Sequence, residues 1–80
     1  MRQRRPDWTR YITSDPRVLK GTPVIQGTRV PVRVLVGSLA GGMSVEEVCE
    51  EYRVKPEQVN AALGYAAEVM AEEHVYALAR

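Results

Sequence analysis

The sequence is poor in the residue types that carry most metal and redox chemistry. It has no phenylalanine, and only one cysteine, one histidine and one tryptophan among its 80 residues. Cys49 cannot form an internal disulfide, and together with His74 it gives no ligand spacing for a metal ion. No candidate nucleophile is paired with a base, and the glutamates are expected on outward helix faces rather than in a pocket. We therefore expect no metal, no cofactor and no enzymatic activity.

Long apolar runs are also missing. No stretch approaches the ~20 apolar residues of a membrane span, and the N-terminus lacks the apolar segment of a signal peptide. Hydrophobic residues nevertheless make up 45% of the chain, which excludes a disordered protein. We expect a soluble, cytoplasmic protein without membrane contact. A chain of this length buries only about 60% of its unfolded surface, which favours completion of the core by a second copy.

The net charge of +1 conceals an uneven distribution of charged residues. Residues 1–33 carry eight basic and two acidic side chains, whereas residues 34–80 carry three basic and eight acidic ones. This asymmetry indicates one end suited to a polyanion and another suited to a different partner, although ordinary scatter on a solvated surface is the alternative. Residues 1–10 show no periodicity, so we expect a flexible basic arm ahead of a single domain at 11–80.

The segment Gly21 to Val32 reads GTPVIQGTRVPV and predicts a small β-hairpin within residues 18–30. Its two glycines lie too far apart for a phosphate-binding loop, in which consecutive backbone N–H groups must converge. Residues 23–25 and 29–30 are suited to two short strands. The tight turn between them contains Gly27, which permits a positive φ.

Five residues of this segment are expected to act as a structural motif: Gly21, Pro23, Gly27, Thr28 and Arg29. The Thr28 hydroxyl is suited to closing the turn. Arg29 is expected to pair with a helix carboxylate or with a carbonyl at a helix C-terminus. Phosphate binding by Arg29 is the competing hypothesis.

Three helices are expected after the hairpin, over about residues 31–40, 44–52 and 56–78, the second of them starting with the capping box Ser44-Val45-Glu46-Glu47. The fold class is therefore mainly α, with a short N-terminal β-hairpin followed by a three-helix, helix-turn-helix-like bundle of the homeodomain type. The predicted core face of the third helix comprises Val59, Ala62, Leu63, Ala66 and Met70. A second apolar stripe on that helix, formed by Tyr65, Val69 and Tyr76, predicts the interface of a homodimer.

The helix-turn-helix pattern over residues 44–63 departs from the usual form at two positions. Arg53 stands where glycine is expected and Lys55 where serine or threonine usually caps, and each costs about 1 kcal/mol. At the start of the next helix, Gln58 and Asn60 are suited to adenine edges, whereas Glu57 would repel phosphate. Simple solvation of an exposed helix start is the alternative.

We expect any DNA contact to come chiefly from the basic N-terminal third, because mobile arginines suit phosphates and minor grooves. The candidate DNA-binding residues are Arg2, Arg4, Arg5, Arg10, Arg17, Lys20, Arg33, Gln58 and Asn60.

Three blocks in order, GTPVIQGTRVPV, LAGGMSVEEV and PEQVNAALGYAAE, resemble the bacterial family called domain of unknown function 433 (DUF433) over about residues 12–68. Many members of that family are similar to VapB-type antitoxins that pair with a PIN-like ribonuclease toxin. The resemblance implies that role here. The turn after Tyr52 departs from the commoner Tyr-Pro-x-Leu-Thr form, which weakens the case for a DNA contact at that place.

Two hypotheses follow. In the first, the chain is an antitoxin-like regulator whose dimer binds its own promoter DNA with the basic half and a PIN-like toxin with the acidic C-terminal helix. In the second, it is a protein-interaction or dimerisation module that does not bind DNA. The presence of a neighbouring gene for a PIN-like nuclease would support the first hypothesis, and its absence would favour the second.

Overall fold

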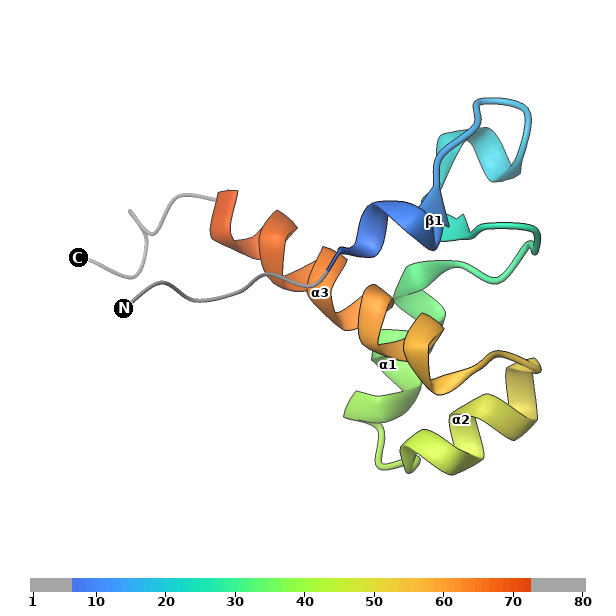
Figure 1. Ribbon diagram of the computed structural model, residues 1–80, viewed down its shortest axis with the longest axis vertical. Coiled ribbons are helices and arrows are strands. Elements are labelled where there is room, and N and C mark those ends of the chain that lie inside the picture. The colour runs from blue at the N-terminus through green and yellow to red at the C-terminus, as the bar shows by residue number, and fades with distance from the viewer. Residues whose placement is uncertain (1–6, 73–80) are drawn as a thin grey trace.

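The computed structural model describes residues 7–72, and it consists of a two-stranded antiparallel sheet followed by three helices (Figure 1). The predicted fold class is confirmed. The elements in chain order are the 3₁₀ turn η1 (Trp8–Arg10), strand β1 (Ile12–Thr13), the 3₁₀ turn η2 (Leu19–Gly21), strand β2 (Val24–Ile25) and helices α1 (Val32–Ala40), α2 (Val45–Tyr52) and α3 (Pro56–Glu72). The predicted third helix continues to about residue 78, and its last part lies outside the described residues.

The sheet pairs different segments from those that the sequence suggests. β2 lies antiparallel to β1, with Ile12 opposite Ile25, rather than to residues 29–30. On the other side of β2, the Ile25 N–H donates to the Val30 carbonyl at 2.9 Å, and Pro31 forms an isolated bridge. Proline has no N–H to donate, so a ladder cannot continue past this point.

The described part of the chain begins with a turn that contacts α3. Residues 1–6 of the expected arm lie outside the described residues, but Trp8–Arg10 form a 3₁₀ turn. The Trp8 ring meets the Tyr65 ring of α3 edge to face, with centroids 4.8 Å apart. An aromatic contact of this kind fixes Trp8 against α3, so the packed part of the chain already includes residue 8.

Local sequence signals define the ends of α2. The Ser44 N–H donates to Glu47 Oε1 at 2.8 Å and the Glu47 N–H donates to Ser44 Oγ at 3.1 Å, which completes the predicted capping box. The helix ends at Arg53, which adopts a left-handed conformation with φ 58° and ψ 47°. Arginine therefore occupies the position where glycine is expected, as the sequence predicts.

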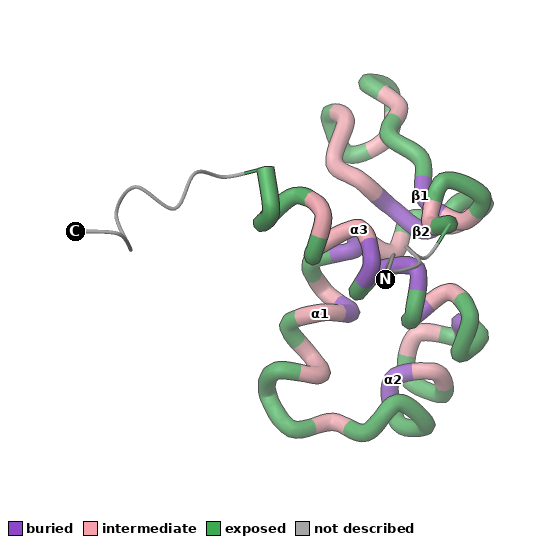
Figure 2. The backbone as a smooth tube through the Cα atoms, turned by 60° about the vertical axis from the view of Figure 1, so that its left-hand side comes forward, coloured by how far each residue is buried: buried purple, intermediate pink, exposed green. Residues whose placement is uncertain are grey.

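The core runs along α3, which packs against α1, α2 and β1 (Figure 2), and the largest fully buried side chains are Ile25, Leu35, Val24, Val48 and Val59. α3 buries Val59, Ala61, Ala62 and Gly64, and no residue after Gly64 is buried within the described part of the helix.

The predicted core face of α3 is wrong at two positions. Leu63 is 39% exposed and Met70 is 68% exposed. The helix instead turns its small residues Ala61, Ala62 and Gly64 inward, which allows the neighbouring elements to approach its backbone closely. Leu63 therefore faces away from the core, whereas Met70 lies beyond Gly64, the last buried residue in the described part of the helix.

Candidate functional site

The turn at residues 26–28 is held by the residues that the sequence singles out. Gly27 has a φ of 82°, which a side chain would strain. The Thr28 hydroxyl donates to the Ile25 carbonyl at 2.7 Å and accepts from the Val30 N–H at 3.0 Å. Gly21, at the end of η2, also has a positive φ, of 85°. Thr28 thus closes the turn in the predicted way.

Arg29 does not take part in this structure as predicted. Its side chain is exposed, and no hydrogen bond or ion pair joins it to another residue within 7–72. The expected pairing with a helix carboxylate or a free helix carbonyl is therefore not formed among these residues. The guanidinium of Arg29 is therefore presented to solvent.

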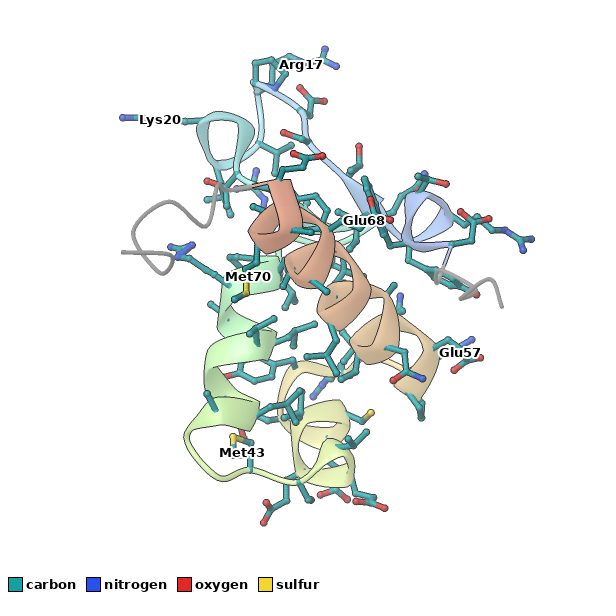
Figure 3. The ribbon with its side chains drawn as sticks, turned by 90° about the vertical axis from the view of Figure 1, so that its left-hand side faces the viewer. Arg17, Lys20, Met43, Glu57, Glu68 and Met70 are labelled. Atoms are coloured by element: carbon teal, nitrogen blue, oxygen red, sulfur yellow. The ribbon has the colours of Figure 1, made fainter. Side chains whose placement is uncertain are left out.

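The basic candidates that the structure describes are all exposed: Arg10, Arg17, Lys20 and Arg33. Arg17 and Lys20 lie on the loop that joins the two strands, at one end of the molecule (Figure 3). Asp15 binds Arg17, with a side-chain N–O distance of 3.1 Å, and also accepts from the Arg17 backbone N–H at 2.8 Å. These two interactions, the side-chain one first, hold the pKa of Asp15 below its ordinary value of 3.8. Arg2, Arg4 and Arg5 lie outside the described residues.

The start of α3 offers less to DNA than its sequence suggests. The side-chain carbonyl of Gln58 accepts from the Lys55 N–H at 2.7 Å, so it caps the helix. Asn60 is exposed. The preceding helix, α2, presents an exposed acidic surface formed by Glu46, Glu47, Glu50 and Glu51. If α3 entered a DNA groove, the carboxylates of the neighbouring helix α2 would repel the phosphates, so this pair of helices is poorly suited to DNA binding.

An apolar groove lies between α1 and the C-terminal half of α3. Its volume is about 410 Å³, and one end is formed by Thr22 and Pro23. Its walls include Val36 and Gly37 from α1 and Tyr65, Ala66, Val69 and Met70 from α3. The sequence identifies Tyr65 and Val69 as interface residues, and both line this groove, whereas Tyr76 lies outside the described residues.

The contribution of α1 to the groove was not predicted. Gly37 is exposed, and a Cβ built on it would meet nothing within 4 Å. A glycine inside a helix destabilises it relative to alanine, so its presence in the pattern of α1 was the available signal.

The described residues contain no group of three or more histidine, cysteine, aspartate or glutamate side chains that could hold a metal ion. Within the same range, no helix combines the length and apolar character needed to cross a lipid bilayer.

Residues 12–66, more than half of the chain, match the family model described as "Protein of unknown function (DUF433)". The chain belongs to the DUF433 family. It is 45% identical over 56 residues to "Uncharacterized protein y4eO" of Sinorhizobium fredii (strain NBRC 101917 / NGR234). This match covers 69% of this chain and 25% of the relative. It also resembles the crystal structure of Rv2018 from Mycobacterium tuberculosis, with a TM-score of 0.60 and 36% identity over 65% of this chain and 24% of that one.

This DUF433 chain thus spans about a quarter of the length of each of these two relatives. The DUF433 match begins at β1 and ends at Ala66. It includes the hairpin turn, α1 and α2, but not Val69 and Met70. The groove is therefore built partly by the family's matched region and partly by residues that follow it.

Proposed function

We propose that this DUF433 protein is an antitoxin-like regulator of a type II toxin-antitoxin pair, which acts as a dimer in the cytoplasm. In this proposal, its basic end binds its own promoter DNA and its acidic surface binds a PIN-like ribonuclease toxin. The family resemblance supports the choice of toxin class. A regulator of this kind needs no catalytic site of its own.

The observation that carries the proposal is the spatial separation of charge. Figure 3 places Arg17 and Lys20 at one end of the molecule and Met43, two residues before the acidic helix α2, at the other end. The principal extents of the molecule are 40 × 30 × 27 Å. Since this length is several times the ~8 Å Debye length at physiological salt, the two ends act on their partners separately.

The acidic end suits a ribonuclease. An enzyme that cleaves RNA needs a basic groove for the substrate backbone, and a helix with closely spaced carboxylates can occupy such a groove in place of RNA. Among the described residues, acidic side chains are densest on α2. We therefore propose α2, rather than the C-terminal helix, as the toxin contact. Arg53 and Lys55, in the following turn, are the basic residues at this end.

The basic end suits a phosphate backbone rather than base recognition. Arg17, Lys20 and Arg29 are exposed on two loops of the sheet, so they can reach phosphates without entry of a helix into a groove.

Co-expression with the product of the adjacent gene tests the toxin part. We expect relief of growth arrest and a co-purifying complex. Replacement of Glu50 and Glu51 by glutamine removes two exposed charges outside the capping box, and we expect it to weaken the complex by roughly tenfold or more. Glu57→Gln, an exposed acidic residue on α3, is the matched control and should leave binding nearly unchanged. Equal binding by all three proteins would exclude α2 as the toxin contact.

The DNA part is tested with the promoter fragment at two salt concentrations. Full-length chain is compared with a chain that starts at Asp7 and so lacks Arg2, Arg4 and Arg5. Each phosphate contact adds about 0.9 to the slope of log affinity against log salt, so loss of three arginines should flatten the slope by up to ~3. Identical slopes and affinities would remove the arm from the mechanism.

The alternative is a protein-interaction module that does not bind DNA. The acidic surface of α2 and the capping role of Gln58 favour this alternative, because both make the helix-turn-helix segment less suited to DNA binding. Absence of any salt-dependent binding to the promoter fragment, combined with retention of the toxin complex, would select this alternative.

A further inference from the structure

The C-terminal half of α3 is longer than the part of the fold that supports it. The helix has 17 residues, yet its buried residues end at Gly64. Short isolated helical segments are only marginally stable in water, and most helical stability in proteins comes from a packed apolar face. After Tyr65, Ala66 and Glu68 are half-buried and the other residues of the helix are exposed, so the described chain supplies little of the apolar packing that normally maintains a helix.

The buried face of α3 continues into this unsupported half. Val69 lies seven residues after Ala62, which is two helical turns, so the two side chains share one face of the helix. Ala62 is fully buried, whereas Val69 is 37% exposed and lines the groove. The core face of α3 thus runs past the core and ends against an open apolar surface.

We propose that the groove seats the C-terminal half of α3 from a second copy of this chain, in a symmetric dimer. This inference rests on the dimeric state in the proposed function and specifies its interface. The surface is self-complementary, because the residues that wall the groove lie on the helix that would fill its counterpart. A surface of this kind is what a twofold contact requires, since the same patch serves both copies.

Charge favours the same occupant. Arg33 is the only charged residue among those that line the groove. α3 carries Glu57, Glu68 and Glu72 and has no lysine or arginine, and Glu68 and Glu72 flank its exposed apolar residues Val69 and Met70. An apolar helix with acidic flanks therefore matches an apolar groove with a basic rim, whereas a basic segment would not.

Gly37 is the position at which a helix in the groove can approach the α1 backbone most closely. It lies in the groove wall without a side chain, and a Cβ built on it would meet no atom within 4 Å apart from those of its chain neighbours and the adjacent backbone of its own helix. That open space lets a second helix pack close to the α1 backbone.

Sedimentation equilibrium on the intact chain is the test, at concentrations from roughly 1 to 100 µM that bracket ordinary homodimer affinities. We expect a mass of twice the 9.0 kDa chain. Val69→Glu should raise the dimer Kd at least about a hundredfold, because the charge enters the interface twice. Leu63→Glu is the matched control, since Leu63 is on the same helix with nearly the same exposure, 39% against 37%, but does not line the groove. It should remain dimeric.

Gly37→Leu separates the interface from folding. Leucine fills the groove while it improves the helix propensity of α1. Below the dimer Kd of the parent, where both proteins are monomers, the variant should therefore unfold at a temperature no lower than the parent, and at higher concentrations it should still sediment as a monomer. Ala40→Leu changes an exposed residue of α1 outside the groove and should stay dimeric. A monomeric parent chain, or a dimer that persists in both Val69→Glu and Gly37→Leu, overturns the inference.

These outcomes are distinct from those of the toxin experiment. If the parent chain is monomeric and Val69→Glu abolishes only co-purification with the adjacent gene product, the groove belongs to that partner and the second-copy inference is wrong. If the chain dimerises through the groove but no complex or DNA binding is found, the proposed regulatory function fails and the dimer stands.

Discussion

Thr28→Val is the sharpest test of how the hairpin turn is held. Valine keeps the shape of threonine and removes the hydroxyl, which donates to the Ile25 carbonyl and accepts from the Val30 N–H. The Ile25 carbonyl still accepts from the Thr28 N–H at 2.9 Å. The Val30 N–H, in contrast, loses its acceptor at a half-buried site, which is the costlier of the two losses.

The expected effect is a loss of about 2 kcal/mol in the free energy of unfolding. Each hydrogen bond contributes about 1 kcal/mol net, and an unpaired, partly buried N–H adds to that cost. For a domain of this size, about 2 kcal/mol lowers the melting temperature by roughly 8–16 °C. Thermal unfolding followed by far-UV circular dichroism measures it.

Thr22→Val is the matched control. The Thr22 hydroxyl also donates to the carbonyl three residues earlier, that of Leu19, at 2.7 Å, but it accepts no backbone N–H and the contact is exposed. We expect a loss of about 0.5 kcal/mol there. Thr28→Ser should retain most of the stability. If Thr28→Val and Thr22→Val unfold at the same temperature, the double contact of Thr28 does not hold the turn.

Three further outcomes are expected. Ser44→Ala should cost about 1 kcal/mol in urea unfolding, because it removes half of the capping box; no loss would contradict the role of the cap. Arg53→Gly should stabilise the chain by up to about 1 kcal/mol, since φ is 58° there; a lower melting temperature would contradict this. The lowered pKa of Asp15 means that its contribution to stability is present above the ordinary pKa of 3.8 and is lost as pH falls through the lowered value. An NMR titration should show Arg17→Ala shifting the pKa of Asp15 back toward 3.8.

Features that depend on neighbouring residues in the chain were predictable from the sequence. The capping box of Ser44 and Glu47 and the turn contacts of Thr28 each join groups within three residues, so residue type and spacing decide them. The left-handed conformation of Arg53 follows similarly from its place between two helices.

Features that depend on contacts between residues far apart in the chain were not predictable from the sequence. The sequence contains no alternation of apolar and polar residues that would predict the pairing of β1 with β2, because each strand has only two residues. The orientation of α3 was also missed. Periodicity identifies an apolar face by its large residues, whereas this helix buries Ala61, Ala62 and Gly64 and leaves Leu63 outside. The groove arises from that orientation, so only its α3 side could be anticipated.

The contact between Trp8 and Tyr65 allows the intrinsic tryptophan fluorescence of the chain to report on the groove. Trp8 is the single tryptophan in the sequence, so its emission needs no label and has no background from other indoles. Its ring meets Tyr65 at a centroid distance of 4.8 Å and an interplanar angle of 84°, while Tyr65 also lines the groove. Anything that enters the groove therefore touches the immediate neighbour of the fluorophore. Dilution of the protein, or addition of a partner, should change the tryptophan emission. Occupancy of the groove can therefore be measured by fluorescence spectroscopy without a label.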